Sequence, residues 1–253
     1  MTVVEALVWL SRSIGNPAAD LAILAEGNAS AKHGDTFWVK ASGFELSNLD
    51  SDGLVSVDLP RAAEFLDGSD LDDMKTREVL ACLTVGRTGR LPSVETFMHA
   101  YLLTLPGVAF VGHSHPTALL SLLCTSRAKE FAAQRLFPDE IVCCGPESAF
   151  VPYTDPGLPL AKAVREAVVT FVDRHGEIPR TIWIENHGLI AVGQSPREVL
   201  GAHLMSAKAA RVTLDALATG MEIKPLLPAQ VERIHRRPDE HYRQQLLSQL
   251  SGA

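Results

Sequence analysis

The sequence predicts an α/β fold whose central sheet contains much antiparallel pairing. Amphipathic helical patterns and short apolar, strand-like runs are interspersed along the 253 residues. Two of the strand-like runs flank the turn His-Gly-Asp at 33–35, which is typical of a hairpin. Strands also follow one another before the helices and between them, instead of alternating strictly with helices. This order favours a meandering sheet over a regular doubly wound parallel sheet.

A single domain is expected over residues 1–253, ending in a helical tail at about 221–253. The chain is 46% apolar, enough for one substantial core, and it is too short for two ordinary domains. It has no internal repeat, low-complexity tract or long Pro/Gly/Ser linker that would mark a boundary.

The individual elements follow from apolar periodicity and from turn residues. The clearest helix start is at 195–198, where Ser195 can cap, Pro196 fits the first position and Glu198 can complete a capping box. Helices are expected over 3–13, 17–25, 60–67, 71–83, 94–105, 117–124, 157–175, 196–219 and 227–249, the last one broken near Pro238. Strands are expected over 28–32, 36–42, 53–59, 107–113, 140–144, 148–153, 181–186 and 189–193.

Charge and cysteine usage limit the partners and the compartment. The chain has 30 acidic and 23 basic residues, a net charge of −7, which repels nucleic acid backbones. Residues 1–15 lack the basic start of a signal peptide, and no apolar stretch reaches the length of a membrane helix. Cys82, Cys124, Cys143 and Cys144 lie among apolar residues without Cys-x-x-Cys spacing, so we expect reduced core thiols in a cytoplasmic protein without nucleic acid or membrane partners.

Three histidines suggest a metal site. His113 and His115 end an apolar run, and alternate residues of a strand point to the same face, so both imidazoles can reach one ion. His187 lies between two apolar strands, next to Gly188, which permits close backbone approach. Catalytic zinc sites commonly use histidine nitrogens and keep one position open. Taken separately, the pair also fits ordinary surface or core histidines, and His187 fits an ordinary turn residue.

A carboxylate stands at the start of a predicted helix. Glu95 follows Pro92 and Ser93, where the helix dipole alone favours a negative charge. Free backbone N–H groups and the Ser93 hydroxyl at the same end can equally hold an anion. His99 lies four residues further on one helix face and can orient the carboxylate. Whether Glu95 meets the histidines within one sheet or across a subunit contact stays open.

Two glycine-bearing segments, 26–32 and 40–45, can present backbone N–H groups to an anion. Each also fits a simple hairpin turn. Neither matches a phosphate-binding or dinucleotide-binding glycine motif, and no Gly-x-Ser-x-Gly nucleophile motif is present.

In order and spacing, five motifs together resemble the class II aldolase/adducin family over about residues 5–220. They are Gly27-Asn28-Ala29-Ser30, Ala41-Ser42-Gly43, Pro92-Ser93-Val94-Glu95-Thr96, His113-Ser114-His115-Pro116 and Asn186-His187-Gly188. The resemblance implies a three-layer α/β/α sandwich with a mostly antiparallel central sheet. It also implies a homotetramer with active sites between neighbouring subunits.

The resemblance assigns roles to individual residues. His113, His115 and His187 match the zinc ligands, and Glu95 matches the acid/base carboxylate. The residues that match those holding the substrate phosphate are Asn28, Ser42, Gly43 and Ser93.

The chain departs in two ways from the fuculose-phosphate aldolases of this family, called fuculose-type enzymes below. Val94 stands where these often have a second serine, and Lys40 is a candidate to compensate electrostatically for the missing hydroxyl. Their proton-transferring tyrosine has no clear match. Tyr242 is a candidate catalytic substitute that also fits a packing role.

The resemblance implies a zinc-dependent aldolase, a lyase that cleaves a ketose phosphate or a related hydroxy-keto compound through a metal-stabilised enediolate. Glu95 would shuttle the proton, and we expect a partly closed pocket to raise its pKa toward neutrality. In the family's 4-epimerase the matching residue is typically aspartate, so glutamate favours aldol chemistry. A decarboxylase, a sugar-phosphate 4-epimerase and a non-catalytic, adducin-like interaction module remain as alternatives. The sequence does not define the substrate or whether it is phosphorylated.

Overall fold

The computed structural model describes residues 1–86 and 89–238. Its strands form one eight-stranded sheet in the order β4-β3-β2-β1-β5-β8-β7-β6, and every neighbouring pair is antiparallel except β6 and β7. The strands are β1 Asn28–His33, β2 Thr36–Lys40, β3 Leu54–Asp58, β4 Thr84–Val85, β5 Phe110–Ser114, β6 Ala149–Val151, β7 Thr181–Ile184 and β8 Gly188–Gly193. The predicted hairpin is the β1–β2 pair, in which His33 faces Thr36.

Two of the longer helices begin at side-chain caps that the sequence offers. The Thr2 side chain and Glu5 form a capping box at α1, and the Ser195 hydroxyl accepts a hydrogen bond from the Glu198 amide at α9, as predicted. The α-helices are α1 Val3–Ile14, α2 Leu59–Glu64, α3 Asp73–Leu83, α4 Thr96–Thr104, α5 Thr117–Leu123, α6 Ala128–Ala133, α7 Pro138–Cys144, α8 Leu158–His175, α9 Pro196–Ala218 and α10 Pro228–His235. Short 3-10 turns lie at Pro17–Ala19, Ser51–Gly53 and Phe65–Asp67.

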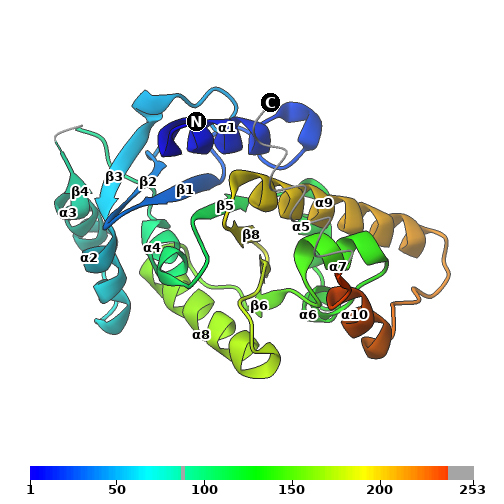
Figure 1. The fold of residues 1–253 in the computed structure, drawn as a ribbon. Helices are drawn as coiled ribbons and strands as arrows, with labels where there is room; N and C mark the ends of the chain where they lie inside the picture. The colour runs from blue at the N-terminus through cyan, green and yellow to red at the C-terminus, as the bar shows by residue number, and fades with distance from the viewer. Residues whose placement is uncertain (87–88, 239–253) are drawn as a thin grey trace.

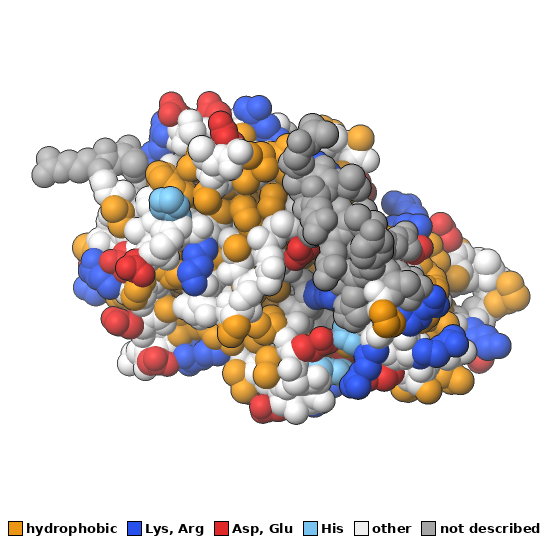
Figure 2. All heavy atoms as spheres, in the orientation of Figure 1, with side chains coloured by type: hydrophobic (Ala, Val, Ile, Leu, Met, Phe, Trp, Pro, Cys, Tyr) orange, Lys and Arg blue, Asp and Glu red, His pale blue; other side chains and the backbone are white. Residues whose placement is uncertain are grey.

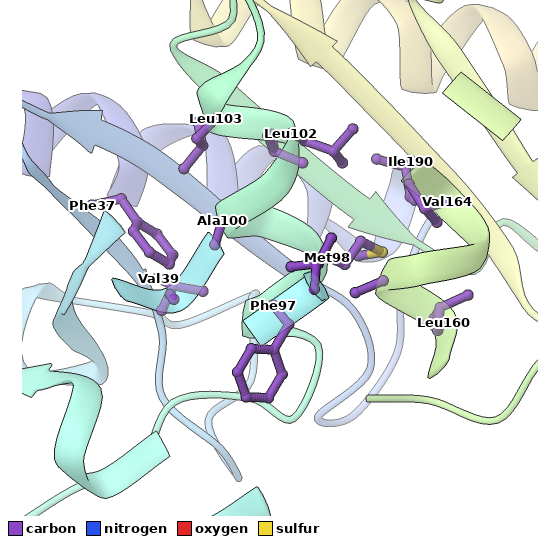
Figure 3. Packing of buried hydrophobic residues seen from close by; sticks show 14 of the residues in the cluster. Phe37, Val39, Phe97, Met98, Ala100, Leu102, Leu103, Leu160, Val164 and Ile190 are labelled. Atoms are coloured by element: carbon purple, nitrogen blue, oxygen red, sulfur yellow. The ribbon is translucent and has the colours of Figure 1, made fainter. Parts of the chain in front are cut away.

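Helices cover both faces of the sheet, which confirms the predicted three-layer fold (Figure 1). On one face, α4 and α8 pack on the strands around Phe37, Phe97 and Val164 (Figure 3). On the other face, α1 and α9 pack on β1 and β8 through residues such as Leu7 and Val199. Helix α4 is apolar nearly all round, as expected of a helix buried between the sheet and neighbouring helices.

The structure corrects several sequence expectations. Residues 140–144, expected as a strand, lie in α7, because Pro138 starts a helix whose apolar side packs against α9. A short apolar run fits either structure by pattern alone. Only a 3-10 turn forms within the helix expected at 17–25, since Asp20 and Leu24 adopt left-handed backbone conformations. Helix α6 was not expected.

The cysteine and tail expectations also change. Cys82 and Cys124 are exposed and only Cys144 is fully buried, so the four thiols are not all core residues. The helix expected at 227–249 begins as α10 and ends at His235. Residues 239–249 of that expectation lie outside the described part of the chain.

The described surface mixes both signs of charge. Figure 2 shows Lys and Arg side chains interspersed with Asp and Glu side chains on the face that it presents. Within residues 1–86 and 89–238, no helix is long and apolar enough to cross a membrane.

Candidate metal centre

The sheet brings the three predicted histidines together. Strand β5 lies between β1 and β8, and its C-terminal end carries His113, with His115 just beyond it. The turn from β7 to β8 supplies His187. The three ring centroids lie 4.8, 5.0 and 5.1 Å apart, and one nitrogen from each ring falls within 4.8 Å of the others. This cluster is typical of a site for one metal ion.

Close backbone packing at the β7–β8 turn sets the position of His187. Asn186 takes a left-handed conformation, with φ of 53°. A Cβ atom on Gly188 would lie 2.5 Å from the Ser114 carbonyl oxygen and 2.8 Å from the His115 ring, so only glycine fits there. The close approach that the sequence suggested for this glycine is confirmed.

The ring nitrogens have the protonation that a metal requires. The His113 Nδ1–H donates to the Leu189 carbonyl at 3.0 Å, which leaves Nε2 bare for an ion. Burial lowers the pKa of both His113 and His115 to about 4, so both imidazoles are neutral at physiological pH. The Nε2 atoms of these two rings lie 3.0 Å apart. Together with His187, these imidazoles form a suitable donor set for zinc or another divalent ion.

Glu95 lies beside the histidines within the same chain, which answers the question that the sequence left open. Its backbone caps α4, and its Oε1 atom lies 3.3 Å from His187 Nε2 and 3.5 Å from His113 Nε2. Its Oε2 atom accepts a hydrogen bond of 2.7 Å from the Asn28 amide. In the strand register, Asn28 is the partner of His113. The side chains are thus placed by the sheet and by the start of α4.

The electrostatics of Glu95 differ from expectation. Burial raises its pKa, but the imidazoles of His113 and His187 and the Asn28 hydrogen bond lower it by more. The pKa of Glu95 therefore lies well below its usual value, and the carboxylate is ionised. The expected shift toward neutrality is wrong for the protein without an ion.

The predicted anion-binding residues flank Glu95. Asn28 Nδ2 lies 3.4 Å from Ser93 Oγ, and the Ser93 amide donates to the Lys40 carbonyl. The loops after β2 and before α4 run together, since the Ser42 amide donates to the Leu91 carbonyl at 2.8 Å. Asn28 and Ser93 thus lie together beside Glu95, and the exposed Ser42 and Gly43 lie in the neighbouring loop.

Lys40 and Glu26 add charge near the histidines. The Lys40 side chain is buried, and its Nζ donates to the carbonyls of Ala25 and Phe44 at 3.2 and 2.5 Å. Burial lowers its pKa, and the negative charge of Glu95 raises it. Glu26 Oε1 lies 3.8 Å from His115 Nδ1. Glu26 was not among the expected site residues, although its place next to Gly27 in the first motif was a signal.

Val94 and Tyr242 are the two remaining positions that the sequence singled out. Val94 is 45% exposed beside Ser93, and as a valine it offers no hydroxyl at this end of α4. Tyr242, the candidate catalytic tyrosine, lies outside the described residues.

These features define an α/β protein with a site for a divalent ion and a buried carboxylate beside it. A family model described as the Class II Aldolase and Adducin N-terminal domain matches residues 5–214. The chain belongs to this family, as its motifs suggested.

A sequence relative of the chain has a description of a different kind. A protein named as an uncharacterized oxidoreductase, YuxG from Bacillus subtilis (strain 168), is 27% identical over 201 residues, which are 76% of this chain and 27% of that protein. The chain therefore spans about a quarter of that relative's length.

Solved structures share the fold. The N-terminal class II aldolase domain of a conserved protein from Thermoplasma acidophilum is 26% identical, with a TM-score of 0.68, over 84% of this chain and 94% of that one. An L-fuculose 1-phosphate aldolase from Glaciozyma antarctica PI12 is 18% identical, with a TM-score of 0.64, over 99% of this chain and 90% of that one.

Proposed function

We propose that this protein is a zinc-dependent aldolase that cleaves a ketose phosphate or a related hydroxy-keto compound into a ketone fragment and an aldehyde. The observation that carries this proposal is the position of Glu95, whose Oε1 lies within 3.5 Å of two histidine nitrogens that face the ion's place. An acid/base group at that distance can reach a proton on a substrate held at the same point.

His113, His115 and His187 would hold the ion. When bound, a divalent ion supplies Lewis acidity to the carbonyl and hydroxyl oxygens of a substrate. The bare Nε2 of His113 and the neutral rings of His113 and His115 can bind the ion without further deprotonation.

Glu95 would move the proton. As an ionised carboxylate, its Oε1 can accept a proton from substrate and return it to the carbon from which the carbon–carbon bond has broken. Oε2 is already occupied by the Asn28 amide, so Oε1 is the oxygen that can perform this exchange.

Asn28, Ser42, Gly43 and Ser93 would hold an anionic group of the substrate. Backbone N–H groups at the start of α4 and the Ser93 hydroxyl are suited to phosphate or carboxylate. The nearby Lys40 ammonium supplies a positive charge. Because the whole chain carries a net charge of −7, such a local cation offsets the repulsion of an anionic substrate.

The family's assembly and compartment extend the proposal. We expect a homotetramer in the cytoplasm, and analytical ultracentrifugation of the full chain would test the assembly.

The decisive experiment is solvent deuterium exchange into dihydroxyacetone phosphate, followed by proton NMR, with the zinc-loaded protein and no aldehyde. Exchange that disappears in His187→Ala is expected. Failure of a fully metallated protein to exchange would count against this phosphorylated ketone and favour a decarboxylase or an aldolase for unphosphorylated keto acids.

Glu95→Gln separates the roles of carboxylate and ion. The amide keeps the shape of the side chain but cannot accept the proton, so exchange should fall by about 10²- to 10⁴-fold. Zinc content, measured by elemental analysis, should not change. Full exchange activity in this variant would remove Glu95 from the mechanism.

A further inference from the structure

Four buried polar side chains form a continuous hydrogen-bonded chain that ends at Glu95. Ser30 Oγ lies 2.7 Å from His99 Nδ1, His99 Nε2 contacts Asn28 Oδ1, and Asn28 Nδ2 donates to Glu95 Oε2 at 2.7 Å. Asn28 and Ser30 are two residues apart on β1, so they share one face of the sheet. Glu95 and His99 are four residues apart at α4, so they share one face of the helix. The strand and the helix therefore contribute alternate members of the chain.

None of these groups has solvent as an alternative partner. His99 and Ser30 are fully buried, Asn28 is 3% exposed and Glu95 is 7% exposed. A buried polar atom that loses its partner costs about 1–3 kcal/mol. The donors and acceptors must therefore match along the whole chain.

The carboxylate fixes the direction of every hydrogen bond. Asn28 directs its NH2 group at Glu95 Oε2 and its carbonyl oxygen at His99 Nε2. A carbonyl oxygen only accepts, so His99 must carry its proton on Nε2. The bare Nδ1 of His99 then accepts from the Ser30 hydroxyl. Burial lowers the pKa of His99 to about 4, which keeps this ring neutral and able to accept at Nδ1.

This tautomer is opposite to that of the two other fully buried histidines in the described part of the chain. His113 Nδ1 donates to the Leu189 carbonyl, and His203 Nδ1 donates to the Val199 carbonyl, both at 3.0 Å. A carbonyl partner demands the proton on Nδ1 in each case. His99 is therefore distinguished by its surroundings rather than by burial alone.

We propose that His99 is a positioning residue that acts on Glu95 through Asn28. The Asn28 hydrogen bond to Oε2 holds the Glu95 side chain in place, and Oε1 stays available for proton transfer. His99 prevents the Asn28 amide from rotating, because the reversed amide would place its NH2 group against the Nε2–H and its oxygen against the carboxylate. Oε2 thus stays an acceptor from Asn28, and Oε1 stays directed at His113 and His187. The proton-transfer part rests on the proposed function, whereas the order of hydrogen bonds does not.

The first test reads the tautomer directly. The zinc-loaded protein is labelled with 15N-histidine, and long-range nitrogen–proton NMR correlations report which ring nitrogen carries the proton. The His99 signals are assigned by their loss in His99→Asn or by their shift in Ser30→Ala. We expect Nε2–H for His99 and Nδ1–H for His203 in the same spectrum. An Nδ1–H or a doubly protonated His99 at neutral pH would overturn the proposal.

The second test compares two substitutions of different reach. In His99→Gln the amide NH2 can take the place of Nε2–H and donate to Asn28, whereas the shorter His99→Asn cannot. Loss of a group that orients a site residue typically costs about 10- to 100-fold in activity. We therefore expect His99→Asn to lower kcat for deuterium exchange by about that factor, with unchanged zinc content. His99→Gln should recover most of the loss.

The control is His203→Asn, which changes a buried histidine that contacts only its own helix by hydrogen bond. It should lower stability without lowering kcat. If His99→Asn retains the wild-type kcat, or if His203→Asn lowers kcat equally, the positioning role is refuted. If the wild-type protein itself fails to exchange deuterium, the proposed function fails, and the tautomer spectrum still decides the hydrogen-bond order.

Discussion

The two sides of the site are built in different ways. The histidine side, defined as His113, His115, His187 and Glu95, lies at the centre of the sheet and is largely buried. The anion side, defined as Asn28, Ser42, Gly43 and Ser93, extends into loops in which Ser42 and Gly43 are exposed. Asn28 is buried and donates to the Glu95 carboxylate, and Ser93, which is partly buried, contacts Asn28 and the Glu95 amide.

Under the proposed function, this difference separates chemistry from recognition. The core fixes the positions of the three histidines and Glu95, because these positions depend on strand register and on helix α4. The loops can change without disturbing that core, as is usual for binding residues held by a rigid scaffold. Substitutions on the histidine side should therefore abolish the reaction, whereas those on the anion side should change the choice of substrate.

The largest expected effect is loss of the ion. His113→Ala removes a fully buried ligand, so two imidazoles remain and we expect zinc occupancy and deuterium exchange to fall to background. Elemental analysis and the exchange assay measure this. The matched control is His33→Ala, in an exposed hairpin turn, which should keep both. Full zinc content in His113→Ala would show that the histidine side is not the metal site.

The next effect is a loss of stability at acid pH, which depends on the burial of His203. His203 packs behind β5, close to Gly112, and burial lowers its pKa from 6.5 to about 4. The unfolded chain then binds a proton more readily than the folded one, so stability falls as pH drops from about 6.5 toward 4. For this one histidine the loss approaches about 3 kcal/mol.

Urea unfolding at pH 7.5 and at pH 5 measures this dependence. His203→Gln removes the titrating group, so its stability should fall less between the two pH values than that of the wild type. An equal fall in both proteins would show that His203 does not contribute to the acid sensitivity.

A smaller effect is expected at Lys40, which lies next to the anion side. Lys40→Met removes the buried cation, and hydrogen bonds to charged groups are worth about 1.5–3 kcal/mol. We expect KM for dihydroxyacetone phosphate to rise by about 10- to 100-fold while kcat changes little. Unphosphorylated dihydroxyacetone is the control substrate, since its KM should change much less. An equal change for both ketones would show that Lys40 acts on the fold of the loops and not on the anion.

The sequence predicted the histidine side better than the elements around it. Alternation on a strand and a glycine at a tight turn are local features that made His113, His115 and His187 candidates, and the resemblance to the family selected them as a set. The helix at 140–144 could not be separated from a strand, because its apolar side is defined by contact with α9, far along the chain.

The charge state of Glu95 and its network also escaped prediction. The i, i+4 spacing suggested that His99 could orient Glu95, but the structure inserts Asn28 between them. That arrangement depends on how β1 lies against α4, and a single sequence contains no signal for it. The lowered pKa follows from the same packing, which brings His113 of β5 and His187 of the β7–β8 turn beside the carboxylate.

The smallest expected effect is a lower KM for the phosphorylated ketone after a substitution at Val94. This side chain is 45% exposed beside Ser93. The resemblance described above makes a second serine the expected residue at this position. Val94→Ser adds a hydroxyl worth about 0.5–1.5 kcal/mol if it reaches the anion, so KM for dihydroxyacetone phosphate should fall by about two- to ten-fold. Because the position is on the surface, the free energy of unfolding should stay within about 0.5 kcal/mol of the wild type.

Val94→Ala separates the hydroxyl from the loss of the apolar side chain and should leave KM unchanged. If Val94→Ser instead raises KM for the phosphorylated ketone, or lowers it equally for dihydroxyacetone, then valine is matched to a substrate without phosphate. The anion side would in that case be adapted to a different substrate from that of the fuculose-type enzymes, on an unchanged histidine side.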